Sequence, residues 1–254
     1  MDLLKGKVAL ITGGGGGVGQ GCAYALAREG CAVVVTGRTE SKLRETVKTI
    51  EGFGGKAMAL VADVTKPDDV TRSVAETVKK YDGLDILVNN AVSEVYIGPL
   101  LEATDESFQA ELEVGPIAAL RYMRAAYPHM KKRGGGTIIN MISGTVVRWD
   151  ARFYGVYSAT KLAISALTRS AACEWGVDGI RALNVAPLSE SPAMTAWIQK
   201  SPDEAKAFLA SIPLGRVGKA EEDIGRGIMA LCLPINQYLT GCTIPIDGGQ
   251  CFFS

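Results

Sequence analysis

Short apolar runs alternate with segments of helical periodicity along the whole chain, and this alternation limits the fold more than any other feature of the sequence. The runs are too short for most helices and are rich in β-branched residues, so we interpret them as strands. They cover residues 7–12, 31–36, 57–62, 84–88, 136–142, 180–185 and 242–246. Strands that are apolar throughout are typical of a parallel sheet with helices on both faces. The sequence therefore predicts an α/β fold with a doubly wound parallel sheet.

The segments between these runs contain the expected helices. These cover residues 18–29, 40–51, 104–132, 154–175 and 220–232, and a further helix opens at Pro67. Proline suits a first helical turn because the N–H that it lacks has no partner there. Residues 189–212 are predicted to be irregular. No linker, repeat or block of charge interrupts the chain, which predicts one domain over residues 1–254.

The charge balance limits the partners of the protein. The chain has 254 residues, with 27 Lys and Arg against 27 Asp and Glu, so its formal net charge is zero. A protein without a net field is not steered to nucleic acid or to an anionic membrane. No apolar run approaches the roughly 18 residues of a membrane-spanning helix. The first residues, MDLLKGKVALITGG, lack a basic start and run into glycines, so they predict a strand rather than a signal peptide.

Six cysteines and one histidine leave little scope for a metal site. The cysteines lie at positions 22, 31, 173, 232, 242 and 251, and no two form a CxxC pair. His129 alone cannot complete a Cys/His zinc site. We interpret the cysteines as reduced packing residues in a cytoplasmic protein, and His129 as a surface residue near a helix end.

A glycine-rich stretch follows the first predicted strand directly. Residues 12–19 read Thr-Gly-Gly-Gly-Gly-Gly-Val-Gly, and a helical pattern follows them. Glycines at this point let backbone N–H groups close on a pyrophosphate, and the positive end of the helix adds attraction. A flexible linker would not separate a buried strand from an amphipathic helix. The stretch therefore predicts a dinucleotide site with contacts at Thr12, Gly13, Gly17, Val18 and Gly19.

The end of the second predicted strand favours one dinucleotide over the other. In NAD-binding sheets an acidic residue at this point accepts hydrogen bonds from ribose hydroxyls. Here Gly37 and then Arg38 follow the strand. A guanidinium can clamp a 2′-phosphate that a carboxylate would repel. A solvated loop arginine is the alternative interpretation, but the pattern favours NADP(H) over NAD(H).

Three side chains around the fifth predicted strand suggest acid–base chemistry. Ser143 follows that strand, and Tyr157 and Lys161 lie four residues apart on one face of the next helix. A phenol titrates near ~10. A neighbouring ammonium and the positive nicotinamide of an oxidised cofactor are expected to lower the pKa of Tyr157 toward neutrality. Such a tyrosine can give a proton to a carbonyl oxygen or take one from an alcohol.

The spacing of tyrosine and lysine is weak support by itself. Tyr127 and Lys131 are also four residues apart, but Pro128 lies between them and no strand-borne serine precedes them. We therefore expect this second pair to be structural. Tyr154 has Ser158 in place of a lysine. Only Tyr157 has the complete context.

With these motifs in place, the chain resembles the short-chain dehydrogenase/reductase family over essentially its whole length. The motifs that carry the resemblance are residues 12–19, Asp63-Val64, Asn89-Asn90-Ala91, Ser143 with Tyr157 and Lys161, Asn184-Val185-Ala186-Pro187 and Ile246-Asp247-Gly248-Gly249. The resemblance implies a Rossmann-like fold with a seven-stranded sheet. It also implies adenine contacts at Asp63 and Val64 and a cofactor groove lined by Asn89, Ala91 and Pro187.

The same resemblance implies roles for the reactive residues. Lys161 would hold the nicotinamide ribose and lower the pKa of Tyr157, while Ser143 would polarise the substrate carbonyl. Hydride would move between nicotinamide and the carbonyl carbon as Tyr157 supplies the proton. Members of the family are usually homotetramers or homodimers, and the helices at 104–132 and 154–175 would form the contacts.

Three positions depart from the family pattern, and they gather toward the reactive end. Val92 replaces a glycine after Asn89-Asn90-Ala91, and Leu188 replaces a glycine after Pro187. Gly115, followed by Pro116, replaces the helix asparagine that holds a water in the family's proton relay. The interval from Ser143 to Tyr157 is also one residue longer. Because Gly-Pro can keep a helix kink, we expect backbone and water to support Lys161 instead.

The expected substrate pocket has an apolar and aromatic character. The family's variable lid corresponds to residues 189–212, and the segment after Ser143 is also rich in such side chains. The candidates are Val146, Val147, Trp149, Phe153, Tyr154, Met194 and Trp197. They suit a bulky hydrophobic substrate, although core packing or a subunit contact explains them equally well. Arg148 and Arg152 could meet an acidic group of the substrate.

The sequence thus predicts an NADP(H)-dependent oxidoreductase that interconverts a ketone and a secondary alcohol. Two alternatives remain open at this point. One is a redox-neutral enzyme on the same scaffold, a dehydratase or isomerase, that uses Tyr157 without consuming the cofactor. The other is a cofactor-binding protein without activity, which the three departures would explain.

Overall fold

The computed structural model describes residues 2–92, 95–148, 150 and 152–253, and its strands form one sheet of seven. In sheet order they are β3 (Lys56–Val61), β2 (Ala32–Gly37), β1 (Val8–Thr12), β4 (Ile86–Asn89), β5 (Gly136–Met141), β6 (Ile180–Pro187) and β7 (Thr243–Ile246). All neighbouring strands are parallel. The order changes direction between β1 and β4. This confirms the predicted α/β class and the seven-stranded Rossmann-like sheet.

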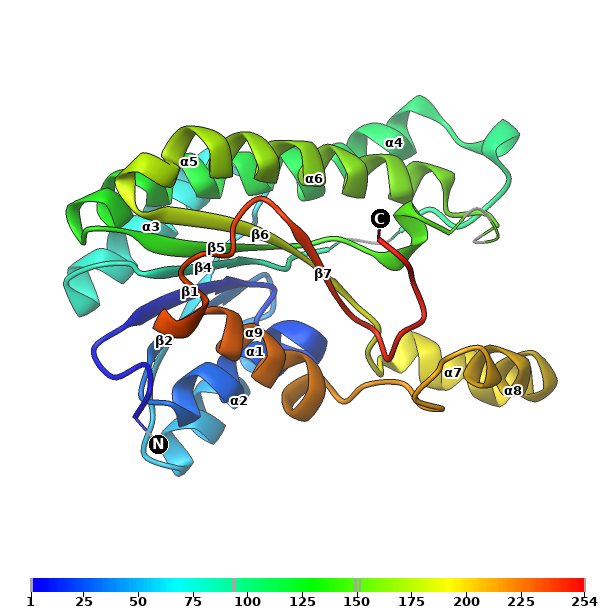
Figure 1. Ribbon diagram of the computed structural model, residues 1–254, viewed down its shortest axis with the longest axis horizontal. Helices are drawn as coiled ribbons and strands as arrows, with labels where there is room; N and C mark the ends of the chain where they lie inside the picture. Colours follow the sequence, from blue (N-terminus) through cyan, green and yellow to red (C-terminus); the bar gives the residue numbers. More distant parts are fainter. Residues whose placement is uncertain (1, 93–94, 149, 151, 254) are drawn as a thin grey trace.

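Helices cover both faces of the sheet (Figure 1). One face carries α1 (Gly17–Arg28), α2 (Glu40–Gly52) and α9 (Arg226–Leu231). The other carries α3 (Pro67–Tyr81), α5 (Ala118–Lys132) and α6 (Gly155–Trp175). Within the described ranges, no helix combines the length and the apolar character that a membrane crossing needs.

The inner strands are mainly apolar because helices cover both faces of the sheet. Along β1, the side chains of Ala9 and Ile11 pack in the core that includes Leu26 of α1. Leu10 points the other way and packs in the core that includes Tyr122 of α5. Successive side chains of a strand alternate between the faces, so a sheet covered on both sides needs apolar residues at every position.

The helix predicted over residues 104–132 is not uniform. It divides into α4 (Asp105–Leu112), a π-helical turn over Glu113–Ile117, and α5. Pro116 lies inside this turn, where its ring displaces the backbone from regular α geometry and its missing N–H frees an upstream carbonyl. The expected irregularity at Gly-Pro is therefore present as a wider turn. It lies directly opposite the first half of α6 in the packing of these helices.

The prediction that residues 189–212 are irregular is wrong. The structure contains α7 (Pro192–Lys200) and α8 (Pro202–Ala210) in this segment. Ser191 caps α7, because its side-chain oxygen accepts a hydrogen bond from the N–H of Met194 at 3.1 Å. A proline opens each helix, where its fixed backbone angle is already helical. Both helices follow β6 and extend beyond the sheet (Figure 1).

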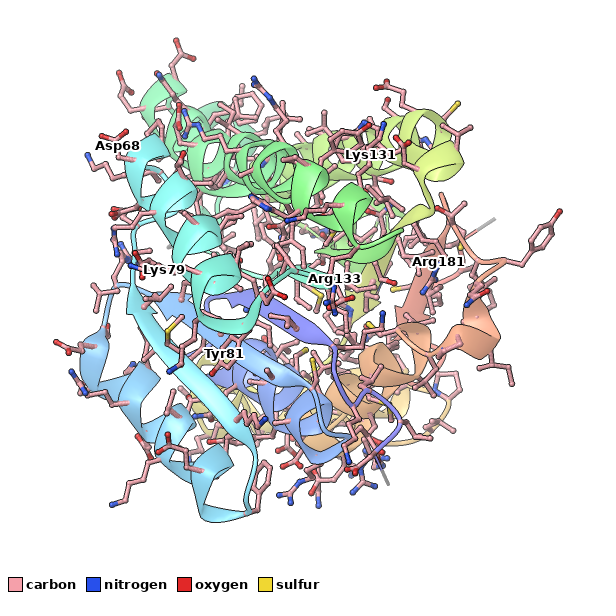
Figure 2. All side chains as sticks on the ribbon, turned by 90° about the vertical axis from the view of Figure 1, so that its left-hand side faces the viewer. Asp68, Lys79, Tyr81, Lys131, Arg133 and Arg181 are labelled. Carbon is pink, nitrogen blue, oxygen red and sulfur yellow. The ribbon has the colours of Figure 1, made fainter. Side chains whose placement is uncertain are left out.

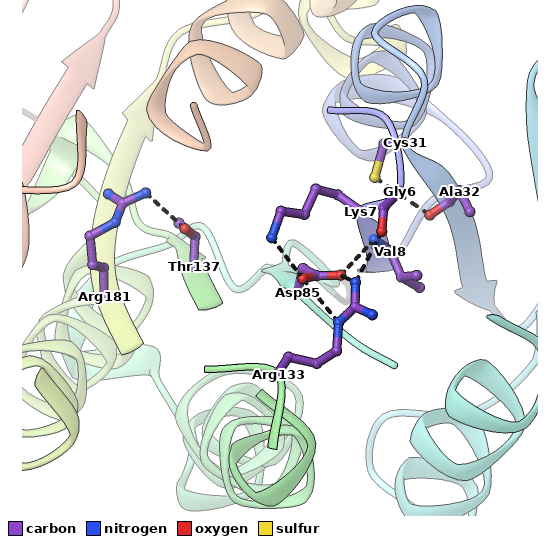
Figure 3. Close-up of polar contacts among 9 residues, drawn as sticks. All are labelled: Gly6, Lys7, Val8, Cys31, Ala32, Asp85, Arg133, Thr137 and Arg181. Atoms are coloured by element: carbon purple, nitrogen blue, oxygen red, sulfur yellow. Dashed lines mark hydrogen bonds and ion pairs between the residues drawn. The ribbon is translucent and has the colours of Figure 1, made fainter. Parts of the chain in front are cut away.

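A buried acid ties the strands together at the amino end of the sheet (Figure 3). Asp85 precedes β4 and is 3% exposed. Its carboxylate accepts hydrogen bonds from the N–H of Val8 at 3.0 Å, from Lys7 Nζ at 3.0 Å and from Arg133 Nη2 at 2.9 Å. A buried carboxylate is tolerated because these partners compensate its lost hydration. The group aligns β1, β4 and the end of α5.

The second Tyr–Lys pair of the sequence is structural, as expected. The hydroxyl of Tyr127 donates to Asp178 Oδ2 at 2.6 Å, and Lys131 Nζ lies 2.9 Å from Asp178 Oδ1. Lys131 belongs to the last turn of α5, on the side of the molecule that Figure 2 presents together with Arg133. This pair is remote from the carboxyl ends of the strands. It joins α5 to the segment before β6.

Candidate active site

The glycine-rich stretch forms an open turn between β1 and α1. Gly13 has a φ of +68°, in the left-handed region that disfavours side chains. A Cβ atom at Gly19 would overlap the carbonyl oxygen of Gly13, so this contact of helix and turn requires glycine. At Gly16 and Gly17 a Cβ would meet nothing within 4 Å. The turn is therefore tightly packed at Gly13 and Gly19, whereas Gly16 and Gly17 border open space.

A cavity of about 540 Å³ lies against this open side. Its lining comes from the turn, the ends of β2, β3 and β4 and the start of α2. Of the predicted cofactor contacts, Gly13, Arg38, Asp63, Val64 and Ala91 line it. Lys42 of α2 lines it as well and was not predicted. Lys42 lies in the first turn of α2, and only the placement of this helix beside the glycine turn brings it to the cavity.

Asp63 is held in one orientation at the side of this cavity. Its Oδ1 accepts hydrogen bonds from the N–H and the hydroxyl of Thr65, at 2.9 and 2.8 Å. The N–H of Asp63 donates to Asp69 Oδ2 at 2.9 Å. Hydrogen bonds from Thr65 and the nearby charge of Arg38 lower the pKa of the Asp63 carboxyl. Asp63 is therefore a fixed anionic acceptor.

The Asn89-Asn90-Ala91 run at the end of β4 is fixed by the last residue of β1. Thr12 Oγ1 accepts hydrogen bonds from the N–H groups of Asn90 and Ala91, at 2.9 and 3.0 Å. The Thr12 side chain is thus used within the protein. Asn89 Nδ2 donates to Asn140 Oδ1 at 2.8 Å, whereas Asn89 Oδ1 is buried and has no hydrogen-bond partner among the described residues. Thr12 and Asn89 line a second, smaller cavity.

The other predicted cofactor contacts also lie at the carboxyl end of the sheet, but they do not line the cavity of about 540 Å³. Gly17, Val18 and Gly19 form the first turn of α1, and Val18 packs against the core below the sheet. Pro187 is the last residue of β6 and pairs with Ile246 in the sheet register.

These observations fit a nicotinamide dinucleotide. The glycine turn leaves room where a pyrophosphate would need backbone N–H groups. The cavity of about 540 Å³ is of the size that small-molecule sites usually have. The partnerless Asn89 Oδ1 is a buried acceptor aimed at this end of the sheet, and such atoms are rare in folded proteins.

The structure brings Ser143, Tyr157 and Lys161 together beside these cavities. Ser143 lies just beyond β5, and Tyr157 and Lys161 lie on successive turns of α6. Lys161 Nζ is 5.3 Å from the centroid of the Tyr157 ring. Hydrogen bonding links the Tyr157 hydroxyl to Ser143 and lowers the pKa of the phenol. The predicted constellation is therefore assembled at the carboxyl ends of the strands.

Further hydrogen bonds hold this constellation in place. Ser143 Oγ accepts from the N–H and the hydroxyl of Thr145, at 3.2 and 3.0 Å. Ser158 Oγ donates to Thr145 Oγ1 at 3.0 Å, which joins α6 to the segment after β5. Lys161 Nζ donates to the carbonyl oxygen of Met141 at 2.9 Å. A backbone carbonyl at the end of β5 therefore supports Lys161, and support through water or through the carbonyl freed by Pro116 stays a prediction.

The pKa values of the two α6 side chains are governed mainly by burial. Burial raises the pKa of Tyr157 to about 12, and the charge of Glu111 also raises it. Burial lowers the pKa of Lys161 to about 8, whereas Glu111 raises it. Without a cofactor the pKa of Tyr157 therefore lies above that of a free phenol, and its lowering by Lys161 together with an oxidised nicotinamide stays a prediction. Loss of hydration is the largest effect on the pKa of Tyr157 and outweighs the hydrogen bond with Ser143.

Glu111 is the site residue that the sequence reasoning missed. It belongs to α4, is 6% exposed, and lines a cavity with Tyr157 and Lys161. Its Oε1 accepts a hydrogen bond from the N–H of Tyr96 at 2.8 Å. A signal was present, since Glu111 precedes Gly115 by four residues and so shares its helix face. Glu111 belongs to none of the motifs that carry the family resemblance, so the sequence alone did not mark it as a site residue.

The segment after Ser143 is partly committed to packing. Val146 packs against the small core cluster that includes Ile142 and Ile164, while Val147 is exposed. Arg148 is paired with Asp150, with Nη2 and Oδ2 2.6 Å apart. Trp149 lies outside the described residues. The rings of Tyr154 and Tyr157 meet edge to face with centroids 6.2 Å apart, so Tyr154 is the aromatic candidate that adjoins the reactive phenol.

The segment predicted as a lid uses its aromatic residues internally. Trp197 of α7 packs edge to face on Phe208 of α8, with ring centroids 5.6 Å apart. Met194 lines a further cavity of about 690 Å³ between α7 and the segment before α9. These contacts make α7 and α8 a packed pair.

Comparison with known proteins places the chain in a family. Residues 14–250 match the family model described as enoyl-(acyl carrier protein) reductase. The chain is 36% identical to 12alpha-hydroxysteroid dehydrogenase from Clostridium sp., over 98% of each chain. The protein therefore belongs to the short-chain dehydrogenase/reductase family, and it is an NAD(P)-dependent oxidoreductase of that family.

Solved structures agree with this assignment. A short-chain type dehydrogenase/reductase from Mycobacterium ulcerans superposes with a TM-score of 0.91 at 28% identity, covering 97% of this chain and 90% of the other. The 3-ketoacyl-(acyl-carrier-protein) reductase from Brucella melitensis, solved in complex with NADH, superposes with a TM-score of 0.88 at 30% identity. That match covers 98% of this chain and 100% of the other.

Proposed function

We propose that the protein is an NADP(H)-dependent oxidoreductase that interconverts a ketone and a secondary alcohol, with reduction as its working direction. The observation that carries this proposal is the convergence of Ser143, Tyr157 and Lys161 beside the glycine turn. The hydroxyl of Ser143 donates a hydrogen bond to the carbonyl oxygen of the substrate. Tyr157 gives that oxygen its proton, and Lys161 supports the site from the α6 side.

The cofactor groove is formed by the turn after β1 and the ends of β2, β3 and β4. When bound, the nicotinamide supplies the hydride. The glycine turn holds the pyrophosphate, Asp63 and Val64 contact the adenine, and Asn89, Ala91 and Pro187 line the groove. Because burial holds Tyr157 protonated in the free protein, the phenol is ready to act as an acid, which favours reduction.

Two cations support the choice of NADP(H). Arg38 and Lys42 both line the cavity at the end of β2. Within the described ranges, neither side chain makes a hydrogen bond or an ion pair of its own. Gly37 leaves the place of a ribose-binding acid empty. A 2′-phosphate would meet two cations at the end of β2, and Gly37 places no carboxylate at the end of that strand.

A bulky, mostly hydrophobic substrate is favoured by the surroundings of Tyr157. Val92 and Phe153 are exposed, at 57% and 53%, and Tyr154 adjoins the reactive phenol. One relative is named a hydroxysteroid dehydrogenase, and a steroid is a bulky, mostly hydrophobic substrate. Residues 189–212 form the substrate lid of a single domain. We further propose a cytoplasmic homotetramer or homodimer that uses α4, α5 and α6.

The test is a titration with NADPH and NADH followed by a screen of ketones and secondary alcohols that includes steroids. We expect tighter binding of NADPH and loss of its absorbance with one alcohol formed per cofactor consumed. Product formation at constant cofactor absorbance would replace the proposal with a redox-neutral reaction. Tighter binding of NADH would overturn the cofactor choice alone.

A further inference from the structure

Three acids are buried in the described part of the chain, and one of them lacks a compensating structural role. Asp85 is compensated by Lys7, Val8 and Arg133, as described above. Asp247, 7% exposed, accepts hydrogen bonds from the N–H groups of Gly249 and Cys251 and so shapes the turn after β7. Glu111 accepts from one backbone N–H, that of Tyr96. Its position beside the reactive residues therefore needs another explanation.

Glu111 lines the same small cavity as the reactive pair. A cavity of about 10 Å³ is lined by Glu111 and Gly115 from the α4 side and by Tyr157, Thr160 and Lys161 from α6. This is about the space that one water molecule requires. A Cβ at Gly115 would come no closer than 3.8 Å to Thr160 or Ile164, so the glycine leaves its side of the space open.

The charges around Glu111 link it to both partners. The titratable groups that act on it from α6 are Lys161 and Tyr157. Tyr154 acts on Tyr157 and raises its pKa. Two further titratable groups nearby have other partners. Glu113 is paired with Arg121, and the Tyr96 hydroxyl donates a hydrogen bond to the carbonyl oxygen of Pro99. Burial raises the pKa of the Glu111 carboxyl, and Lys161 opposes this. Such a carboxyl gains and loses its proton closer to neutral pH than an exposed one.

Reduction of a carbonyl consumes one proton per turnover at Tyr157. The carbonyl carbon gains a hydride, its oxygen gains the phenolic proton, and Tyr157 is left as a phenolate that solvent must re-protonate. Lys161 is buried, at 6% exposure, and Tyr157 is partly exposed, so the proton needs a path past the side chains around this pair. Gly115 has no side chain to take part in one.

We propose that Glu111 is the carboxyl through which Tyr157 regains its proton, across the cavity that it shares with Lys161. The water in that space, or the Lys161 ammonium, gives a proton to the phenolate, and the hydroxide or amine that is left takes the proton of the Glu111 carboxyl. The carboxylate then takes a new proton from solvent. Atoms and charges balance, since one solvent proton enters for each alcohol formed. Glu111 touches no substrate here and acts through Lys161 and Tyr157. The inference rests on the proposed ketone reduction.

The test compares Glu111→Gln with Glu113→Gln. Glutamine at 111 keeps an acceptor for the Tyr96 N–H but cannot carry the proton, while Glu113→Gln removes the same charge outside the cavity. We expect Glu111→Gln to lower the kcat of reduction at least about tenfold, to raise the solvent deuterium isotope effect, and to leave KM unchanged. Small carboxylic acids in the buffer should restore part of its rate, and Glu111→Asp should retain part of it. Glu113→Gln should match the wild type.

A second readout needs no turnover. In carboxyl ¹³C NMR of the unliganded protein, the signal missing from Glu111→Gln should titrate above the ordinary glutamate range, and it should titrate higher still in Lys161→Met. An ordinary pKa for this signal would overturn the inference. So would a Glu111→Gln enzyme with wild-type kcat, isotope effect and buffer response, with the proposed function left standing. If the wild type reduces no carbonyl, the proposed function fails and the NMR titration alone decides whether Glu111 exchanges its proton near neutrality.

Discussion

Tyr157 is held in a setting that keeps its proton in place. Its burial costs the phenolate its hydration, and the nearby Glu111 adds negative charge, so both effects oppose ionisation. Lys161 is buried with it and loses part of its preference for the charged form for the same reason. A buried acid of this kind suits proton donation to a developing alkoxide, where charge is neutralised rather than created.

Replacement of Tyr157 by Phe tests the proton donor. Tyr157→Phe should reduce turnover by about 10²-fold or more, because no other hydroxyl of α6 takes the place of the phenol. Cofactor affinity should be largely retained. The matched control is Tyr127→Phe, which removes a hydroxyl from the other Tyr–Lys pair and should leave turnover unchanged. Steady-state kinetics and cofactor titration measure both effects, and full turnover in Tyr157→Phe would refute the assignment.

Arg38, at the end of β2, is the residue expected to contact the 2′-phosphate of NADPH. Arg38→Ala should weaken NADPH binding about tenfold to a hundredfold, as expected for loss of a charge-assisted hydrogen bond, and leave NADH binding nearly unchanged. Arg44→Ala removes an arginine that pairs with Glu40 on the surface of α2 and serves as the control. Fluorescence titration with both cofactors measures the change. Equal losses for NADPH and NADH would argue against a contact with the 2′-phosphate.

Single residues were predictable from the sequence where a motif fixes both type and place. Ser143, Tyr157 and Lys161 belong to such a motif, and the structure brings them together. The pKa of Tyr157 was not predictable, because its direction depends on burial by α4 and the turn at Gly115, which are remote in sequence. Glu111 was missed for the same reason, since only the packing of α4 against α6 turns an ordinary helix acid into a buried one.

At the level of elements, the π-helical turn at Glu113–Ile117 connects the Gly-Pro departure with the site. It interrupts the helix at the point where α4 and α5 meet, next to the turns of α6 that carry Tyr157 and Lys161. Pi-helical turns of this kind often occur at functional sites. Here the turn places Gly115, with open space in front of it, beside the reactive pair.

Introducing asparagine at position 115 tests this element. Because a Cβ fits there with contacts no shorter than 3.8 Å, Gly115→Asn should fold with an unfolding free energy within about 0.5 kcal/mol of the wild type. Its turnover should depend on pH differently, since an amide enters the cavity beside Lys161. Denaturant unfolding and pH–rate profiles measure the two quantities. An unchanged profile would count against a relay role at this position.

The strands were the most predictable elements, because the inner strands are buried on both faces and therefore form mainly apolar runs. Residues 189–212 were predicted to be irregular, although Ser191 and the two prolines are ordinary signals for helix starts. The helices α7 and α8 are short and pack mainly on one another through Trp197 and Phe208, so they lack the long apolar stripe that marks α3 or α5. The turn at Pro116 was expected as a kink, but its π geometry depends on packing.

At the scale of the whole molecule, the sheet order explains why residues from the entire length of the chain meet. The order changes direction between β1 and β4, and ligands of such sheets bind beyond the carboxyl ends of the strands at that point. The glycine turn after β1, the run after β4 and Ser143 after β5 all lie there. A group that is buried at this edge and needed for activity, such as Lys161, therefore also affects the free energy of unfolding.

Lys161 allows that link to be measured. Its pKa in the folded protein, lowered by burial to about 8 from 10.5, corresponds to about 3 kcal/mol of stability lost at pH 7. Between pH 8 and pH 10.5 the unfolded chain binds more protons at Lys161 than the folded protein does. The loss of stability caused by Lys161 therefore becomes smaller as the pH rises through this range. Lys161→Met should therefore unfold at higher denaturant concentration than the wild type at pH 7, with a difference that shrinks toward pH 10.5, and it should be inactive.

The exposed Lys79→Met is the control for this comparison and should change the unfolding free energy by less than about 0.5 kcal/mol. Denaturant titrations at several pH values measure all three proteins. Destabilisation of Lys161→Met at pH 7 would contradict the expected cost of the buried ammonium.

The Asp85 network lies at the amino edge of the sheet, away from the groups that meet ligands. Lys7, Val8 and Arg133 thus secure the alignment of β1, β4 and α5 at the edge where no chemistry takes place. Exchanges in the segments around Ser143 and in α7 and α8 leave this anchorage intact. Such a separation lets new substrate preferences arise by replacement at one rim while the scaffold remains secured at the other.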